Sequence, residues 1–363
     1  MTAWTCLVLG DDFTPAALFE RVLGDRLAAD GMAVSFRSID IESNDVTAYR
    51  SGEVSEAFGN VDEIARHVAD CQFLVTTFAP VTADLIDRAP RLVAICCGRG
   101  GPVNINVAAA SERGIPVLHA PGRNEDAVAE FVIAGMINLM RRIPVALDWV
   151  RQGSWTTPLE DTFEKPSGPE LSRQTLGLVG AGRIGCLVAR LARAFGTRVL
   201  ATDPFADPAS LAAAGVEAVP LDSLLAESTI ISIHARLAGG SRPLLGRNEF
   251  AAMAKRPWLL NTARAAALDY DALLAALADD RIAGALIDVY PDEPLPPDSP
   301  LFGVTPDRLL LTPHVAGISS DVPARTAAML ADGLARLLAG TRPRHVANPD
   351  VLATAFRRLD TGP

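Results

Sequence analysis

Three side chains in the second half of the sequence combine a permanent cation, an acid and a titratable base. Arg264 follows the apolar run "WLLNTA", Glu293 follows "ALIDVYPD", and His314 ends "LLLTPH". An arginine can hold a carboxylate through two parallel hydrogen bonds. A histidine can exchange a proton near neutral pH, and a neighbouring carboxylate raises its pKa and fixes its tautomer. Taken singly, each has a simpler interpretation, because loop arginines and glutamates are usually solvated and a histidine after Thr-Pro usually packs or caps.

A parallel sheet is the element that would bring these three side chains together. Short apolar, β-branched runs alternate with helix-length segments along the chain, which is typical of an α/β fold with helices on both faces of parallel sheets. In such sheets ligands bind beyond the carboxyl ends of the strands, where we expect all three side chains. The predicted strands cover residues 6–10, 73–77, 92–97, 116–120, 175–180, 198–203, 229–234, 258–263, 285–290 and 309–314.

The length of 363 residues fits two domains of ordinary size. The alternation is interrupted once, by segment 151–174, which is rich in Pro, Ser, Thr and Gly. Before it, a segment starting near Asn124 is apolar on most of its circumference and predicts a long helix buried between domains or subunits. The amphipathic segment 323–340 is expected to cover the first domain.

Charge, hydropathy and cysteine content exclude several classes of protein. The net charge of -10 disfavours nucleic acid and anionic membranes as partners, although a small anionic substrate needs only local positive charge. The N-terminus lacks a basic region before a long apolar core, and no run of ~18 apolar residues appears, so we expect neither a signal peptide nor a membrane span. The 5 cysteines lack C-x-x-C spacing and predict reduced thiols of a cytoplasmic protein, with no disulfide framework and no metal site.

The segment "TLGLVGAGRIGCLVARLARAFGTRVLATDP" predicts a dinucleotide-binding turn. Gly180 ends a strand, and Gly182 and Gly185 complete the pattern G-x-G-x-x-G at the start of an amphipathic helix. The glycines permit a tight turn, close approach of the backbone to a pyrophosphate and close helix–strand packing. Asp203, about 20 residues on, can accept hydrogen bonds from the adenosine ribose and would repel a 2′-phosphate, which favours NAD over NADP. Arg183 either adds a pyrophosphate contact or is an exposed turn arginine.

Together with this dinucleotide-binding turn, the three side chains are those that hydride transfer to a 2-keto acid requires. The arginine would hold the carboxylate, the histidine would protonate the developing alkoxide, and the nicotinamide would carry the redox chemistry. The loop "CCGRGGPVN" (96–104) is the predicted substrate loop, because the N–H groups of Gly100 and Gly101 can bind a carboxylate. Arg99 either binds a second anion or is solvated, and Phe78 either shapes the pocket or packs.

Four motifs, "GLVGAGRIGCLVARLARAFGTRVLATDP", "NTAR", "DVYPDEP" and "TPHVAG", resemble in order and spacing those of the D-isomer-specific 2-hydroxyacid dehydrogenases. The resemblance covers residues 90–320 well and the N-terminal part only in its pattern. It implies that Arg264 clamps the substrate carboxylate and carbonyl, that His314 is the acid/base and that Glu293 is its partner. It also implies further cofactor contacts from Ile184, His234, Thr262, Ala263, Asp288 and Gly317.

The same resemblance implies two doubly wound parallel-sheet domains. A flavodoxin-like substrate domain would be built from both chain ends, residues 1–120 and 318–363, and a Rossmann NAD-binding domain would span residues 121–317. The implied protein is a homodimer joined through its cofactor domains. It would transfer a hydride between NAD and a D-2-hydroxy acid or 2-keto acid, with a sugar acid or phosphoglycerate-like acid as the expected substrate.

The chain departs from the family pattern in three places. Ala265 stands where a glycine usually follows the arginine, and alanine restricts both φ and close backbone approach. Arg236 replaces the proline of "H-x-P", and "KRPW" (255–258) replaces a lysine-proline-glycine turn.

Two alternative functions remain open at this point. The first is a non-catalytic NAD-responsive binding protein or corepressor on the same fold. Such a sensor needs only the dinucleotide-binding turn, so the presence of Arg264, Glu293 and His314 favours an enzyme. The second is a formate dehydrogenase, which usually has glutamine at the position of Glu293.

Overall fold

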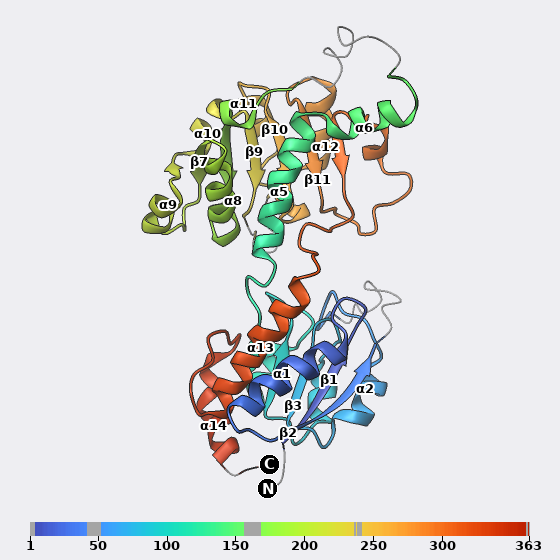
Figure 1. Ribbon diagram of the computed structural model, residues 1–363, viewed down its shortest axis with the longest axis vertical. Helices are drawn as coiled ribbons and strands as arrows, with labels where there is room; N and C mark the ends of the chain where they lie inside the picture. The colour runs from blue at the N-terminus through green and yellow to red at the C-terminus, as the bar shows by residue number, and fades with distance from the viewer. Residues whose placement is uncertain are drawn as a thin grey trace. The chain divides into compact units, whose positions relative to one another are not determined.

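The computed structural model describes residues 4–41, 52–155, 168–235, 237, 242–360 and 362. The chain divides into two compact units, which Figure 1 shows. The terminal unit comprises Met1–Arg123 and Ser319–Pro363, and the central unit comprises Asn124–Ile318. Each unit is built around its own parallel sheet.

The sheet of the terminal unit holds five parallel strands in the order β2-β1-β3-β4-β5. The chain places β2 on one side of β1 and β3 on the other, so the topological switch point lies between β1 and β3. The strands are β1 Trp4–Gly10, β2 Val34–Asp40, β3 Phe73–Thr76, β4 Ala94–Cys97 and β5 Val117–His119.

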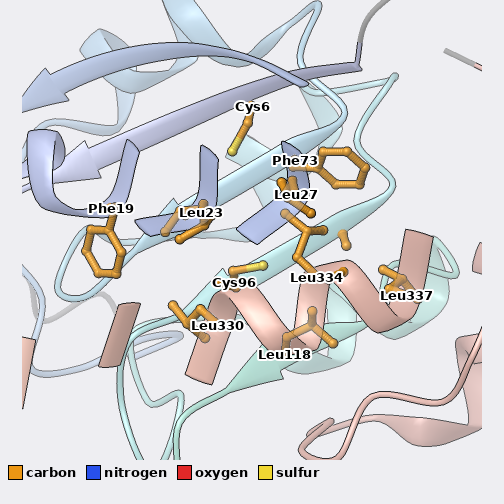
Figure 2. Packing of buried hydrophobic residues seen from close by; sticks show 14 of the residues in the cluster. Cys6, Phe19, Leu23, Leu27, Phe73, Cys96, Leu118, Leu330, Leu334 and Leu337 are labelled. Atoms are coloured by element: carbon orange, nitrogen blue, oxygen red, sulfur yellow. The ribbon is translucent and has the colours of Figure 1, made fainter. Parts of the chain in front are cut away.

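Helices cover both faces of this sheet. On one face α1 (Ala16–Ala29) and α13 (Val322–Leu338) bury their leucines against the strands, and Figure 2 shows these side chains around Cys6, Phe73, Cys96 and Leu118. The C-terminal part of the chain thereby completes the core of the N-terminal sheet, together with α14 (Leu352–Asp360). A second apolar cluster on the other face includes α2 Val61–Val68, α3 Ala83–Asp87 and α4 Val107–Glu112.

The central unit contains a seven-stranded parallel sheet in the order β12-β11-β10-β9-β6-β7-β8. The chain reverses its direction of travel across the sheet between β6 and β9, which places the switch point there. The strands are β6 Thr175–Val179, β7 Arg198–Thr202, β8 Glu217–Ala218, β9 Ile230–Ile233, β10 Trp258–Asn261, β11 Gly284–Ile287 and β12 Leu309–Leu311.

Two apolar clusters sandwich this second sheet. One joins it to α5, α8 and α9, and Figure 1 shows α5 crossing one face of the sheet. The other joins it to α10, α11 and α12. The helices are α5 Glu125–Met140, α6 Ile143–Arg151, α8 Arg183–Ala194, α9 Pro208–Ala214, α10 Leu221–Glu227, α11 Arg247–Ala252 and α12 Tyr270–Ala278.

The structure confirms the α/β class with two parallel sheets, and every predicted strand segment overlaps an observed strand. The pattern missed β2 and β8, because both are edge strands with exposed or half-exposed side chains and lack an apolar run. The long helix predicted from Asn124 ends at Met140, and a separate helix begins at Ile143. The break falls at Arg142, whose φ of 52° is left-handed and ends the regular helix.

Among the residues that the structure describes, no helix combines the length and the apolar character that a bilayer crossing requires. All five cysteines are free thiols, and Cys6, Cys71, Cys96 and Cys97 are buried. Burial raises the pKa of the Cys96 thiol to about 12, so it is a protonated core side chain at neutral pH.

Candidate active site

The loops after β11 and β12 bring Glu293 and His314 into direct contact. His314 Nδ1 lies 2.7 Å from Glu293 Oε2. The hydrogen bond from Glu293 raises the pKa of His314, and this effect outweighs the opposing effect of burial. Burial would raise the pKa of Glu293, but its bonds to His314 and to the N–H of Tyr290 lower it overall. The pair therefore favours a protonated imidazole beside a carboxylate.

Asp288 holds the loop that carries His314. Its carboxylate is fully buried after β11 and accepts hydrogen bonds from the Thr312 hydroxyl at 2.5 Å and from the N–H groups of Val315 and Ala316 at 2.9 Å. His314 itself has a left-handed φ of 56°, which is uncommon for a residue other than glycine. Asp288 therefore positions the histidine backbone from both sides, and its predicted cofactor contact stays a prediction.

Arg264 follows β10 and has an exposed side chain. The side-chain amide of Asn261 donates to the Arg264 carbonyl at 3.1 Å, and Arg264 Nη1 donates to the Ala263 carbonyl at 2.8 Å. No carboxylate in the described ranges forms an ion pair with Arg264. Its charge is close enough to act against protonation of His314 and to favour ionisation of Glu293. The arginine thus lies beside the acid–base pair with its charge unpaired.

Ala265 occupies a position where alanine is not strained. It begins a short turn of 3-10 helix, Ala265–Ala267, and its φ is not among the positive ones. The expectation that alanine restricts the backbone here is therefore wrong for φ, because this turn does not need the left-handed region. Arg236, the second departure, lies outside the described residues.

The glycine turn between β6 and α8 fits a bound pyrophosphate. Gly180 has a φ of 96°, and a Cβ there would lie 2.6 Å from the Ala235 nitrogen. A Cβ on Gly185 would lie 2.6 Å from the Gly180 carbonyl oxygen, so helix and strand need glycine to approach this closely. A Cβ on Gly182 would meet nothing within 4 Å, which leaves open space at the N-terminus of α8.

Asp203 lies directly after β7, and two backbone groups orient its carboxylate. Oδ2 accepts from the N–H of Ala181 within the glycine turn, and Oδ1 accepts from the N–H of Phe205, both at 2.9 Å. The acid is thereby attached to the pyrophosphate turn, as a ribose-binding residue requires. Arg183 begins α8, and its Nε lies 2.8 Å from Glu125 Oε2. The arginine is therefore in an ion pair, and its side chain is still 57% exposed, as the second alternative predicted.

Other predicted cofactor residues of the central unit lie at the carboxyl ends of its strands. Thr262 follows β10, and its buried hydroxyl has no hydrogen-bond partner among the described residues, as expected of a group that binds a ligand. His234 follows β9, its Nε2 lies 2.9 Å from the Ser232 hydroxyl, and burial lowers its pKa to about 4. The remaining predicted residues are half-buried Ile184 in α8, Ala263 beside Arg264, and Gly317, where a Cβ would meet Asn124.

The predicted substrate residues belong to the terminal unit. Arg99 forms an ion pair with Glu56, and its guanidinium lies 5.0 Å from the centre of the Phe78 ring. It is therefore not the solvated loop arginine that the sequence left open. Phe78 also stacks on Phe58, with ring centres 5.4 Å apart. Gly100 and Gly101 follow in the same loop at the carboxyl end of β4.

Sequence reasoning missed the residues that hold the candidate site in place. Thr312, Tyr290 and Asn261 each bond to a loop that carries a predicted residue. Thr312 and Asn261 do lie within the quoted motifs "TPHVAG" and "NTAR", but spacing alone does not reveal which loop a hydroxyl or amide will bond. The backbone N–H of Tyr290 carries no signal in the sequence at all.

Comparison with known proteins places the chain among dehydrogenases. Residues 133–316 match the model of the D-isomer specific 2-hydroxyacid dehydrogenase, NAD binding domain. A glyoxylate reductase of Korarchaeum cryptofilum is 35% identical over 80% of this chain and 86% of its own length. A D-3-phosphoglycerate dehydrogenase of Archaeoglobus fulgidus is 33% identical over 79% of this chain and 53% of its own length.

A solved structure has the same fold. The crystal structure of the TT0316 protein from Thermus thermophilus superposes with a TM-score of 0.74 and 31% identity, covering 94% of this chain and 99% of the other. The non-catalytic alternative finds no support in these similarities. The chain therefore belongs to the D-isomer specific 2-hydroxyacid dehydrogenase family and is an NAD-dependent dehydrogenase of that family.

Proposed function

We propose that Arg264, Glu293 and His314 carry out the reversible conversion of a D-2-hydroxy acid to its 2-keto acid. The observation that carries this assignment is the 2.7 Å contact between His314 Nδ1 and Glu293 Oε2, beside an arginine that has no carboxylate partner among the described residues. A sugar acid or a phosphoglycerate-like acid is the proposed substrate. A relative named D-3-phosphoglycerate dehydrogenase supports a phosphoglycerate-like acid, and one named glyoxylate reductase supports a 2-keto acid in general.

Each of the three side chains has a distinct task in this proposal. Because Nδ1 of His314 faces Glu293, its Nε2 is the atom that gives a proton to the substrate oxygen during reduction and removes it during oxidation. Glu293 stabilises the protonated ring and fixes its tautomer. Arg264 binds the substrate carboxylate and favours negative charge on the reacting oxygen. NAD, when bound to the glycine turn, supplies the hydride chemistry.

We also propose the arrangement of the whole protein. The substrate domain would comprise residues 1–120 and 318–363, and the NAD-binding domain residues 121–317, which the division of the chain after Arg123 and after Ile318 supports. The free thiols are compatible with the reducing cytoplasm, which is the proposed location. Nucleic acid is not proposed as a partner, since the net charge is -10.

A spectrophotometric assay of NADH oxidation tests the proposed activity. Glyoxylate, hydroxypyruvate, phosphohydroxypyruvate and pyruvate are supplied in turn, and we expect turnover of at least one of them. NADH binding without turnover of any 2-keto acid would contradict the proposal and favour an NAD-responsive binding protein.

The Glu293→Gln variant is expected to shift the pH dependence of reduction toward acid. Glu293 raises the pKa of His314, so removing its charge lowers that pKa. Reduction needs the protonated imidazole, and its rate is lost as the pH rises through the histidine pKa. The descending limb of kcat/KM against pH should therefore move to lower pH. Glu130→Gln, on an exposed position of α5, is the control. An unmoved limb in Glu293→Gln would contradict the pairing.

The Asp203→Asn variant is expected to relax the preference for NAD. Asparagine keeps one oxygen, which can accept from the N–H of Ala181 or of Phe205 but not from both, and it removes the charge that would repel a 2′-phosphate. The ratio of kcat/KM with NADPH to that with NADH should rise about tenfold or more. Asp207→Asn, at the N-cap of α9, is the matched control, because asparagine also caps helices well. Equal ratios in all three proteins would exclude Asp203 as the selective residue.

We propose a homodimer joined through the central unit. α6 has no buried residue, and Leu147 and Val150 on it are 52% and 54% exposed. Exposed apolar side chains on a helix without buried residues are typical of an interface. Light scattering after size exclusion should give twice 38.3 kDa for the wild type and one chain for Leu147→Glu/Val150→Glu. Asp148→Ala on the same helix should leave the mass unchanged, and a monomeric wild type would contradict the dimer.

A further inference from the structure

Arg99 is a positioned cation at the carboxyl edge of the five-stranded sheet. Its side chain is 14% exposed, it pairs with Glu56, and it donates to the Glu56 carbonyl at 2.9 Å. The guanidinium also lies over the Phe78 ring, 5.0 Å from its centre. A guanidinium has five N–H donors, so these contacts orient it and still leave donors for a ligand.

Arg123 is a second cation at the same edge, just after β5. It is half-buried, and no carboxylate in the part of the chain that the structure describes forms an ion pair or hydrogen bond with its side chain. Burial is the main cause that lowers the pKa of Arg123, and the charge of Arg99 is the next. The charge of Arg99 therefore acts against that of Arg123, and the backbone bond from Ala120 N–H to the Arg99 carbonyl joins the two segments.

The loop that follows Arg99 has its carbonyl groups occupied by hydrogen bonds. The Arg99 carbonyl accepts from the N–H of Ala120 at 2.9 Å, and the Gly100 carbonyl lies 3.0 Å from His119 Nδ1. The Gly101 carbonyl accepts from the N–H of Val103. With the carbonyls occupied, the N–H groups of Gly100 and Gly101 have no acceptor among the described residues. Consecutive free N–H groups are a typical anion-binding arrangement.

The local acids do not neutralise this pair of arginines. Glu56 compensates Arg99 alone. Asp11 is near enough to influence Arg123, but its carboxylate is occupied by Thr14 and by the N–H of Phe13, and burial raises its pKa. A half-buried cation without a partner is destabilising unless a ligand supplies the missing charge. Arg123 is therefore the residue that most needs an anion.

We propose that Arg99 and Arg123 form a subsite for a second anionic group of the substrate, a phosphate or a second carboxylate. This inference rests on the proposed function, in which the terminal unit binds the substrate. It narrows the substrate to 2-hydroxy acids that carry a second anion. The free N–H groups of Gly100 and Gly101 would face the same ligand.

Selectivity between singly and doubly anionic acids tests the subsite. NADH oxidation is measured with glyoxylate, with phosphohydroxypyruvate for the phosphate and with 2-oxoglutarate for the carboxylate. Arg123→Gln should lower the ratio of kcat/KM for the preferred dianionic acid to that for glyoxylate by about tenfold or more. Glu56→Gln, which removes the competing charge, should raise this ratio. Arg91→Gln, at the amino end of β4, removes the same charge elsewhere and should leave the ratio unchanged.

The outcomes separate the subsite from the proposed function. Equal losses on all acids in Arg123→Gln, or a lower ratio in Glu56→Gln, would overturn the subsite while turnover of glyoxylate still supports the function. If no 2-keto acid is turned over, the function fails, and calorimetric titration with inorganic phosphate and with malonate tests the subsite alone. Binding that Arg123→Gln abolishes would support it, and absence of binding in the wild type would overturn it.

Discussion

The His314→Asn variant is expected to lose about two to four orders of magnitude in kcat while it still binds NADH. Asparagine is the informative replacement because His314 has a left-handed φ of 56°, which asparagine tolerates better than alanine does. The backbone bonds from Val315 and Ala316 to Asp288 can then remain. The loss would come from the missing proton donor and not from a rearranged loop.

The pH profile of this variant separates acid–base catalysis from simple positioning. In the wild type, reduction should decline as the pH passes through the raised pKa of His314, which lies above the ordinary value of 6.5. His314→Asn has no such group, so its residual rate should lack that decline. Glu293→Gln retains the imidazole and should lose much less at low pH. A variant with kcat within a few-fold of the wild type would remove His314 from the chemistry.

The sequence correctly placed the three candidate side chains after strands, and their catalytic roles stay predictions. Arg264, Glu293 and His314 each follow an apolar run, and parallel strands carry their ends to one edge of a sheet. Periodicity alone was enough for that placement. Periodicity could not predict the 2.7 Å contact between Glu293 and His314, because that contact depends on the conformation of two irregular loops.

The sequence could not predict the edge strands or the hydrogen bonds that hold the loops in place. β2 alternates between half-buried and exposed side chains, as an edge strand does, so it lacks the apolar run by which the central strands were found. Asp288 looked like a cofactor contact, and only the folded chain reveals that Thr312, Val315 and Ala316 donate to it. Long-range bonds of this kind depend on loop conformation, which residue spacing does not encode.

Arg183 illustrates the same limit within the best-predicted motif. The glycine turn and the following helix were expected in detail, and the structure agrees. The ion pair between Arg183 and Glu125 joins the first turn of α8 to the first turn of α5, which lie far apart in the sequence. Whether that arginine was partnered or solvated could therefore not be decided from the turn itself.

The Arg264→Lys variant is expected to lower kcat/KM for the best 2-keto acid by about 10- to 150-fold. Lysine keeps the positive charge beside Glu293 and His314, but an ammonium cannot form two parallel bonds to a carboxylate. Arg264→Ala should lose more, because it also removes the charge that favours the developing alkoxide. Arg247→Lys, exposed at the start of α11, is the control for the substitution itself.

The division of the loss between kcat and KM decides what Arg264 does. A clamp that binds substrate and transition state equally would change KM alone, whereas a contact that strengthens with charge on the oxygen would lower kcat as well. Since Arg264 has no carboxylate partner in the described part of the chain, its bonds to a carboxylate should form only with the substrate, and we expect both constants to change. Full kcat/KM in Arg264→Lys would show that a point charge suffices and that the two-bond clamp is wrong.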